Sequence, residues 1–436
     1  MPKKKQKIFQ APKGMKDVLF EEQIYWEKFR KISKEVAENF NYQRIDTPIL
    51  EDMELFVRGT GATTDIVQKQ MYTLKTHGGH CLALRPENTP GIARAYLENG
   101  MANLPQPVKF YYFGLMFRHE QPQAGRWRQL CQFGFEIIGD GDAVLDAQII
   151  QSCAFLLKNL GIKKISVQIN SLGCKACRPA WRKALMNYYR YHQESVCVNC
   201  RRRLKENPFR LLDCKEEKCQ SIKVQAPNAV DYLCDECHQH FKNVLEYLDE
   251  LEIPYFLNNS IVRGLDYYTK TVFEIFSEDE IGSGLGNALG GGGRYDYLVA
   301  MLGGKPTPAV GAALGVDRII NLMKKQNQIK AAPFTPKVFL AQLGGRARKK
   351  SLKIFEKLNE AGIKTAESMS RDSIKVQLKI ADKLGVLFSL ILGQQEALDD
   401  TIIIRDMRSG VQETVPQKKV AEEIKKRLAK KIKGVI

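Results

Sequence analysis

Apolar side chains recur with two different periods along the first third of this 436-residue chain. Between residues 17 and 40, Phe20, Ile24, Ile32 and Val36 fall on one side of a helical projection, which predicts a helix with one apolar face. Shorter apolar runs close to Pro or Gly then predict strands, at residues 81–84, 108–113 and 133–138. Because few helices separate these strands, we expect a mostly antiparallel sheet.

The pattern changes near Asn170 and stays different until about residue 240. This stretch holds paired cysteines and a basic helical run, residues 201–205, between the strand patterns on either side. Strand character resumes at residues 267–276 and continues through the glycines at 290–293 into a helix after Gly311. We therefore expect an α+β domain formed by residues 1–169 and 241–325, interrupted by a cysteine-rich insertion at residues 170–240.

The last hundred residues have a third pattern. Residues 326–335 are mostly polar with a proline near the end, which is typical of a linker. Beyond them, strands at 338–343, 363–367 and 387–392 alternate with helices at 346–360 and 373–384, which predicts right-handed crossovers on a mixed sheet. A basic helix with an apolar residue at every fourth position from Val420 to Ile432 should pack against that sheet. Residues 336–436 are thus predicted to form a separate α/β domain.

The charge balance favours an anionic partner. Lys and Arg number 67 against 49 Asp and Glu, a net charge of +18, which steers nucleic acid above all towards a protein surface. Solubility alone would also account for such a charge. No run of roughly 18 apolar residues could span a bilayer, and the first residues lack the apolar core of a secretory signal. We therefore expect a cytoplasmic protein that makes no membrane contact.

Eight of the eleven cysteines occur in pairs within the insertion. Three pairs have the CxxC spacing and one is wider, and two such pairs can complete a tetrahedral zinc site. The spacing leaves open which pair joins which, whether His238 or His240 replaces a sulfur, and whether some pairs are simply free thiols. We predict structural zinc bound by Cys174, Cys177, Cys197, Cys200, Cys214, Cys219, Cys234 and Cys237.

Arginines in two distant segments are candidates for binding phosphate. Arg118, Arg126 and Arg128 lie in a strand–loop–strand pattern, where an arginine on a rigid strand can offer paired donors to a phosphate. A surface hairpin with solvated charges would have the same local pattern. Far downstream, a strand of small residues at 311–315 leads into a helix that presents Arg318, a second contact for a polyphosphate.

These two segments, together with residues 44–50, resemble motifs 2, 3 and 1 of the class II aminoacyl-tRNA synthetases, in the right order. Residues 84–89 (LRPENT) and 262–268 (VRGLDYY) are similar to the segments with which histidyl-tRNA synthetases hold histidine, and residues 292–296 also fit. Residues 377–383 and 391–393 resemble the anticodon-binding domain of the same family. The resemblance covers nearly the whole chain. It implies a class II catalytic domain with a mostly antiparallel sheet, followed by an α/β anticodon-binding domain.

The resemblance also implies an activity. The protein would join L-histidine and ATP as histidyl-adenylate, release pyrophosphate, and pass the histidyl group to tRNA(His), releasing AMP. ATP would be bound by Arg118, Arg126, Leu130 and Arg318, with Mg²⁺ across the phosphates, and the catalytic residues would be Arg118, Arg263 and Arg318. The family further implies a homodimer built on residues 21–48. Histidine would be held by Glu87, Asn88, Thr89, Gln132, Glu136, Tyr267, Tyr268 and Tyr295.

Physical reasoning supports part of this assignment independently. Selecting histidine requires polar partners for both ring nitrogens, because a wrong substrate then leaves buried polar groups unpaired. By resemblance Glu136 and Tyr268 would contact the imidazole, while Glu87, Thr89 and Gln132 would hold the ammonium group. Taken alone, Glu136 would more often be a salt-bridge partner of a loop arginine. Activation needs no protein nucleophile, so catalysis would rest on positioning and electrostatic stabilisation.

Three positions and one loop depart from the family pattern. Leu130 stands where the family usually has a phenylalanine that stacks on adenine, and Asp317 replaces a glutamate before the motif 3 arginine. Asn88 replaces a glycine. The loop Gln121–Ala124 lacks the basic residues that commonly contact the tRNA acceptor end. We therefore expect the contacts to adenine and to the tRNA acceptor end to differ from those usual in the family.

Two other classes of protein remain open on sequence grounds. One is a synthetase-like regulatory subunit of histidine biosynthesis that binds histidine without activating it. The three retained arginines and the anticodon-type domain argue against this alternative. The other is a nucleic-acid-binding module built on the basic, cysteine-rich insertion. The glycines between 282 and 293 have neither dinucleotide nor P-loop spacing, so we interpret them as tight turns.

Overall fold

The computed structural model describes residues 8–121, 127–278, 288–326 and 336–433, and the chain divides into two compact units, Met1–Ile329 and Lys330–Ile436. Most of the linker predicted at 326–335 therefore lies outside the described residues. In the described part of the chain, no helix is long and apolar enough to cross a membrane.

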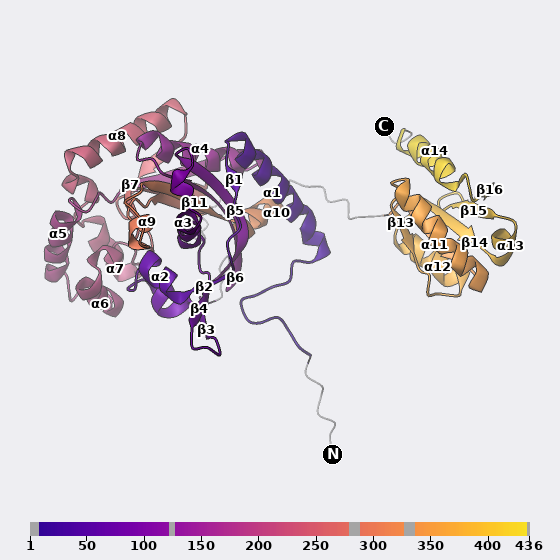
Figure 1. Cartoon of the computed structure of the whole chain (residues 1–436), viewed down its shortest axis with the longest axis horizontal. Coiled ribbons are helices and arrows are strands. Elements are labelled where there is room, and N and C mark those ends of the chain that lie inside the picture. Colours follow the sequence, from indigo (N-terminus) through magenta and orange to yellow (C-terminus); the bar gives the residue numbers. More distant parts are fainter. Residues whose placement is uncertain (1–7, 122–126, 279–287, 327–335, 434–436) are drawn as a thin grey trace, which may run out of the picture. The chain divides into compact units, whose positions relative to one another are not determined.

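An eight-stranded sheet organises the first unit (Figure 1). Neighbouring strands run antiparallel except for the β1–β5 and β7–β8 pairs, so the prediction of a mostly antiparallel sheet is confirmed. In spatial order the strands are β1 (Gln43–Arg44), β5 (Val108–Phe117), β6 (Gln129–Ile138), β11 (Ala309–Gly315), β10 (Gly290–Arg294), β9 (Thr269–Ser277), β7 (Ile165–Ser171) and β8 (Tyr255–Leu257).

Alternating side chains let the inner strands of this sheet bury residues on both faces. On β5, Tyr111 joins one apolar cluster with Phe133 and Phe135, whereas Phe110 and Tyr112 join another on the opposite face. The first cluster is covered by α1 (Phe20–Asn39), α4 (Ala143–Asn159), α8 (Asp235–Glu250) and α10 (Val316–Lys325). The second faces α3 (Thr89–Glu98) and α9 (Leu298–Met301).

The strand predicted at 81–84 belongs to a different sheet from its expected neighbours. β4 (Cys81–Leu84) pairs with β2 (Leu50–Asp52) and β3 (Tyr72–Lys75) in a separate three-stranded sheet. The inclusion of this strand in the main sheet was wrong, because sheet membership depends on long-range pairing that a short apolar run does not encode. Next to this sheet lie α2 (Met53–Thr60) and the π-helical turn η1 (Ile66–Gln70).

Between β7 and β8 the chain forms a group of short helices. They are α5 (Arg178–Tyr191), α6 (Val198–Glu206), η3 (Pro208–Leu211), α7 (Glu217–Val224) and η4 (Ala229–Tyr232), followed by α8. In Figure 1, α5, α6 and α7 gather beside α2 and α9. Residue 240 falls inside α8, which continues without a break against α4.

The second unit has the expected strand–helix alternation. Its sheet order is β13 (Thr365–Glu367), β12 (Val338–Gln342), β14 (Phe388–Leu392), β15 (Thr401–Asp406) and β16 (Gln412–Pro416), parallel for the first three strands and antiparallel for the rest. α11 (Gly345–Glu360), α12 (Ile374–Lys383), α13 (Gln394–Leu398) and α14 (Val420–Lys433) accompany it. Val420 and Ile424 are buried, so the packing expected of the last helix is confirmed.

Candidate active site

A cavity opens where β6, β10 and β11 run side by side, close to the start of α3. It encloses about 1100 Å³, its open mouth included. Asn88 and Glu136 do not line it, and Arg126 lies outside the described residues. The structure brings the other predicted residues together in its wall, namely Glu87, Thr89, Arg118, Leu130, Gln132, Arg263, Tyr267, Tyr268, Tyr295 and Arg318.

Glu87 is a buried carboxylate that two hydroxyl groups hold in place. Thr60 donates to its Oε1 at 2.7 Å and Tyr267 donates to its Oε2 at 2.6 Å. Burial raises the pKa of Glu87, an effect that these hydroxyls and the nearby Arg118 and Arg263 oppose. A cationic group that entered the cavity would favour the charged carboxylate, as an amino acid ammonium does.

Gln132 offers a second acceptor in the same wall. It lies on β6, and its Oε1 is buried without a hydrogen-bond partner among the described residues. An orphaned buried oxygen costs free energy until a donor reaches it. The cavity therefore presents a carboxylate and an unpaired carbonyl to an incoming donor group.

Glu136 lies behind the cavity wall, only 1% exposed. Thr89 donates to its Oε1 at 2.7 Å, and Tyr295 donates to its Oε2 at 2.5 Å. Burial raises the pKa of Glu136 to about 8. Gly311 stands opposite it on β11, where a Cβ atom would come within 1.7 Å of the Glu136 carboxylate. The strand of small residues therefore makes room for this carboxylate.

Asn88 has a different environment from its two neighbours. Its Oδ1 accepts hydrogen bonds from Thr47 at 2.7 Å and from Arg85 at 3.2 Å. Arg85 also donates to the Thr47 carbonyl oxygen at 2.9 Å. Asn88 thus joins the segment before α3 to the extended segment that follows β1, without facing the cavity.

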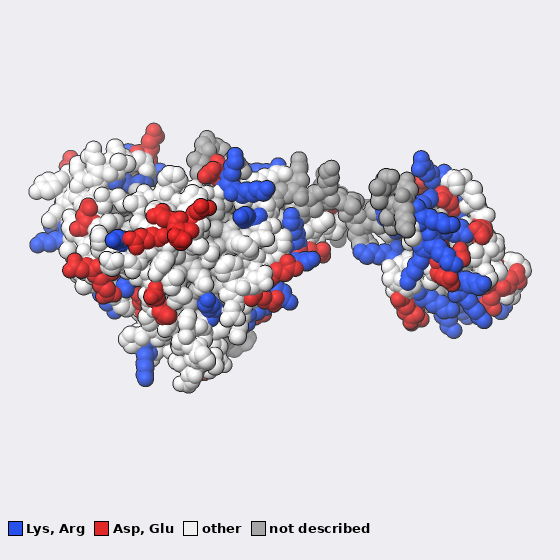
Figure 2. Space-filling model, turned by 90° about the horizontal axis from the view of Figure 1, so that it is seen from above, with Lys and Arg blue, Asp and Glu red and all other residues white. Residues whose placement is uncertain are grey.

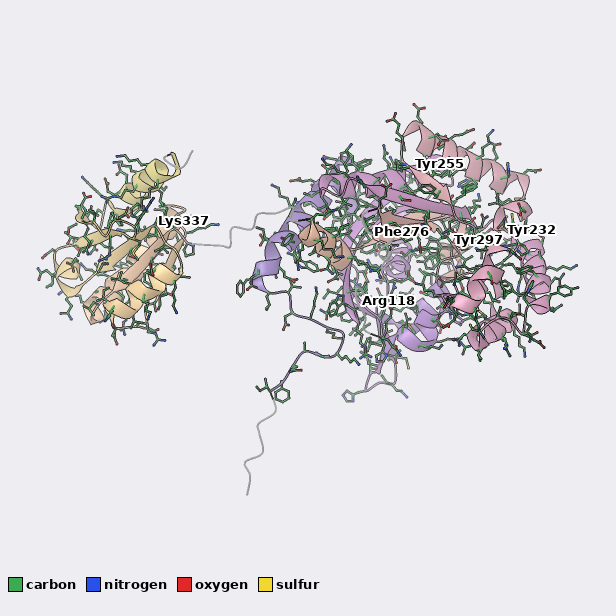
Figure 3. All side chains as sticks on the ribbon, turned by 180° about the vertical axis from the view of Figure 1, so that it is seen from behind. Arg118, Tyr232, Tyr255, Phe276, Tyr297 and Lys337 are labelled. Carbon is green, nitrogen blue, oxygen red and sulfur yellow. The ribbon has the colours of Figure 1, made fainter. Side chains whose placement is uncertain are left out.

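Three arginines from three distant segments converge on the cavity. Arg118, labelled in Figure 3, follows β5 and donates from Nε to the Pro86 carbonyl oxygen at 2.8 Å. Arg318 is in the first turn of α10 and donates to the Ala288 carbonyl oxygen at 2.7 Å. Backbone and side-chain anchors of this kind preorganise cationic groups for an anionic ligand.

Arg263 has an unusual backbone conformation for an arginine, with φ of 56°. Its Nη1 lies 2.7 Å from Glu274 Oε1, and its guanidinium carbon is 5.6 Å from the centroid of the Tyr268 ring. A Cβ atom on Gly291 would come within 2.8 Å of that Nη1. The glycines of β10 therefore allow this arginine to approach the sheet.

The positions that depart from the family pattern also have defined surroundings. Asp317 accepts a hydrogen bond from the Cys131 backbone N–H at 2.8 Å and lies 3.6 Å from Lys16 Nζ. Leu130 lines the cavity, and so does Trp127, whose ring lies 5.2 Å from Lys16 Nζ. Of the loop at 121–124, only Gln121 is among the described residues.

The structure adds residues that sequence reasoning missed. Tyr112, Glu120, Trp127 and Glu274 line the cavity, and Thr60 holds Glu87 from behind. Trp127 lies within the recognised strand–loop–strand segment, so its aromatic character was the available signal. Thr60 comes from α2, outside every recognised motif, and no local pattern pointed to it.

The eight paired cysteines form two groups of four, with the sulfur atoms of each group within 4.8 Å of one another. The first CxxC pair meets the last, with Cys174 and Cys234 sulfurs 4.0 Å apart, and the second meets the wider pair, with Cys197 and Cys214 sulfurs 3.8 Å apart. Although burial opposes it, hydrogen bonds from backbone N–H groups and neighbouring thiols lower the pKa of Cys174 to about 7. Each group thus has the four thiols of a tetrahedral metal site.

Neither histidine near the last CxxC pair belongs to these groups. His240 Nε2 lies 3.3 Å from Asp146 Oδ1, and Asp146 also accepts from Arg294 at 2.6 and 2.9 Å. Arg294 immediately precedes Tyr295, whose hydroxyl reaches Glu136. The buried network of His240, Asp146 and Arg294 therefore supports one wall of the cavity.

Comparisons with known proteins agree on one family. The histidyl-tRNA synthetase family model matches residues 14–175 and 210–319, and an anticodon-binding domain model matches residues 337–427. The histidine–tRNA ligase of Dehalococcoides mccartyi is 45% identical over 97% of this chain and 100% of its own. That of Desulforamulus reducens is 41% identical over 95% of this chain and 99% of its own.

Solved structures give the same answer. The apo histidyl-tRNA synthetase of S. aureus is 32% identical, with a TM-score of 0.76 over 95% of this chain and 99% of its own. A Bacillus halodurans structure described as an ATP phosphoribosyltransferase regulatory subunit/histidyl-tRNA synthetase has a TM-score of 0.63 over 89% of this chain and 99% of its own. At 21% identity it shows the shared fold alone. The chain belongs to the histidyl-tRNA synthetase family.

Proposed function

We propose that this protein is a histidine–tRNA ligase, which activates L-histidine with ATP and transfers it to tRNA(His). The observation that carries the proposal is the cavity itself. Two buried carboxylates stand at or behind its wall, and three arginines from separate segments converge on it. These groups would suit a zwitterionic amino acid with a polar ring and a polyphosphate bound side by side in the one cavity.

In the proposed complex, histidine binds with its ammonium group against Glu87, Thr89 and Gln132. The imidazole ring faces Tyr268 and is recognised by the hydrogen-bonded network of Thr89, Tyr295 and Glu136. Tyr267 keeps Glu87 in place, and Asn88 holds the segment that presents both Glu87 and Thr89. A substrate without both ring nitrogens would leave polar groups of this network unpaired, which supplies selectivity.

For activation, Arg118 and Arg263 are proposed to contact the α-phosphate and Arg318 the γ-phosphate. The histidine carboxylate attacks the α-phosphorus, and pyrophosphate leaves as the bond to the β-phosphate oxygen breaks. The arginines stabilise the charge that develops on the phosphate oxygens. Glu120 and Glu274 are carboxylates in the same cavity that fit Mg²⁺, which would neutralise phosphate charge when bound. Arg126, Leu130 and Trp127 are proposed to surround the adenosine.

The second unit is the proposed anticodon-binding domain. Residues 337–436 contain 22 Lys and Arg against 12 Asp and Glu, so more than half of the net charge of the chain resides there. Figure 2 shows a face of this unit on which Lys and Arg predominate. Such a surface attracts RNA through its phosphates. In the second half-reaction the terminal ribose hydroxyl of tRNA attacks the adenylate carbonyl, and AMP leaves.

The remaining predictions concern architecture. We assign residues 1–169 and 241–325 to the catalytic domain and residues 170–240 to an insertion that binds two structural zinc ions. Residues 326–335 would form a linker, and residues 336–436 would bind the anticodon. Four thiols per group fit zinc, which would supply folding free energy to a small insertion. A homodimer through residues 21–48 and a cytoplasmic location complete the proposal.

The decisive experiment is histidine-dependent exchange of labelled pyrophosphate into ATP by the purified protein. We expect exchange with histidine and none with the other amino acids, followed by charging of tRNA(His) transcript. A regulatory subunit would bind histidine without exchange, and an RNA-binding module would do neither. Either outcome would overturn the proposed function.

A further inference from the structure

The second cysteine group consists of Cys197, Cys200, Cys214 and Cys219. Three polar side chains in the chain segment between Cys200 and Cys214 contact residues outside the insertion. Arg203 and Arg210 both donate to Asp65 Oδ2 at 3.0 Å, and Asn207 donates to Asp266 Oδ1 at 3.2 Å. All three lie between Cys200 and Cys214, on α6, on η3 and at the junction of the two. Both acceptors belong to the rest of the first unit. The insertion therefore contacts the catalytic region through a short segment that two cysteines of one group delimit.

These contacts lie next to the residues that hold Glu87, the carboxylate proposed to bind the histidine ammonium group. Asp266 also accepts from Thr63 at 3.0 Å, and its backbone N–H donates to the Thr60 carbonyl oxygen at 3.0 Å. Thr60 and Tyr267, the residue after Asp266, donate to the two oxygens of Glu87. Thr60 is thus five residues from Asp65, and Tyr267 is next to Asp266, the two aspartates that the insertion contacts.

The first cysteine group makes a parallel contact. Arg178 follows Cys177 and donates to the backbone carbonyl oxygen of Tyr268. Lys175 lies between the two cysteines of that pair, and its Nζ is 4.1 Å from the ring centroid of Tyr297, which Figure 3 labels. Residues next to each cysteine group therefore contact the segment 263–268: Arg178 contacts Tyr268, and Asn207 contacts Asp266.

The segment between Cys200 and Cys214 combines short elements with a few apolar contacts. Only Cys200 and Leu204 are buried on the nine-residue α6, and η3 is a single turn whose Phe209 packs on Trp181. A helix this short is marginal without tertiary support, and a thiolate metal site supplies that support as folding free energy. The position of Arg203, Asn207 and Arg210 would therefore depend on metal at the second group.

We infer that metal bound by Cys197, Cys200, Cys214 and Cys219 positions the histidine site, because it holds Arg203, Asn207 and Arg210 against Asp65 and Asp266. The inference rests on the proposed function, in which Glu87 binds the histidine ammonium group. Arg203 and Asp266 are positioning residues, since they act on the substrate through Thr60, Tyr267 and Glu87. The insertion is then a metal-dependent support for amino acid binding.

Two arginines that are neighbours on α6 provide a matched test. Arg203 contacts Asp65, whereas Arg202 is 3.8 Å from Glu206 on its own helix and does not reach Asp65. We expect Arg203→Ala to weaken histidine binding about tenfold by calorimetry, the effect of losing one charge-assisted hydrogen bond. The KM for ATP and the zinc content should stay at wild-type values. Arg202→Ala should bind histidine as the wild type does, and Arg203→Lys should recover part of the loss.

The metal itself is tested on the full-length protein. A zinc chelator should lower histidine affinity in parallel with zinc loss at the second group, and added zinc should restore it. Cys214→Ser should have the same effect, with Cys81→Ser, an exposed cysteine outside both groups, as control. Unchanged histidine affinity in Arg203→Ala and in zinc-depleted protein would overturn the inference. A wild-type protein that fails to bind histidine or exchange pyrophosphate would instead refute the proposed function.

Discussion

At the scale of single residues, the most informative group is the buried carboxylate of Glu136. Thr89 and Tyr295 donate to its two oxygens, and burial raises its pKa from an ordinary 4.5 to about 8. The folded protein therefore keeps this proton at pH values where the unfolded chain has lost it. An imidazole ligand, which itself titrates near neutrality, would meet a carboxyl group whose charge changes in the same range.

This difference predicts a pH dependence of stability. Between about pH 4.5 and 8 the folded state binds more protons at Glu136 than the unfolded state, so its contribution to the free energy of unfolding falls as pH rises. Above about pH 8 the contribution becomes constant. Glu136→Gln cannot titrate, so the stability of wild type relative to this variant should decline over that window in urea unfolding. A pH-independent difference between the two proteins would contradict the assignment.

The converging arginines predict a catalytic loss without unfolding. Arg118→Ala and Arg263→Ala should each lower histidine-dependent pyrophosphate exchange by roughly 100-fold or more, because each removes a preorganised donor to developing charge. Arg202→Ala, on the insertion, should retain exchange. Near-normal exchange in both folded variants would remove Arg118 and Arg263 from the proposed mechanism.

The adenine side of the cavity gives a prediction on binding. Leu130→Phe should lower the KM for ATP about fivefold, since an added aromatic face contributes about 1 kcal/mol of stacking. Trp127 also lines the cavity, so Trp127→Ala should raise that constant. A Leu130→Phe variant with unchanged KM for ATP, together with a large effect of Trp127→Ala, would show that the tryptophan already supplies the stacking face.

At the scale of elements, the glycines of β10 and β11 connect the sheet to the site. A Cβ atom on Gly311 would lie 1.7 Å from Glu136 Oε2 and 2.8 Å from the Phe135 carbonyl oxygen. Gly311→Ala should therefore displace Glu136 and weaken histidine binding severely, as calorimetry would measure. Gly141→Ala is the control, because its Cβ atom would meet only Pro308 at 3.5 Å or more. Equal histidine affinity in the two variants would show that the strand can shift.

The same elements show how far the sequence could be interpreted. Apolar patterns located β5, β6, β9, β12 and β14 to within a few residues, because burial of one or both strand faces leaves a local signal. They could not assign β4 to its own three-stranded sheet or pair the cysteines in groups, since both depend on contacts between distant segments. The motifs located the cavity wall but not Thr60, whose role exists only in the folded chain.

At the scale of the whole molecule, the first unit exposes apolar side chains near the proposed two-fold interface. Leu19 and Phe20 are 58% and 80% exposed at the start of α1, and Ile49 and Leu50 are 45% and 41% exposed just beyond β1. Exposed large apolar residues can mark an interaction surface. These residues adjoin the segment 21–48 to which we assign dimerisation, which remains a prediction.

The oligomeric state can be tested directly in solution. Light scattering at micromolar concentration should give about 99 kDa, twice the 49.5 kDa of one chain. Phe20 directly precedes the proposed interface segment, and in a two-fold dimer its substitution changes both chains. If burial of each Phe20 ring stabilises the dimer by about 2 kcal/mol, Phe20→Asp should weaken the dimer by well over a hundredfold. Leu398→Asp, at an exposed position of the second unit, should leave the mass unchanged. A fully active wild-type monomer would refute the assignment of residues 21–48 as an interface that the enzyme requires.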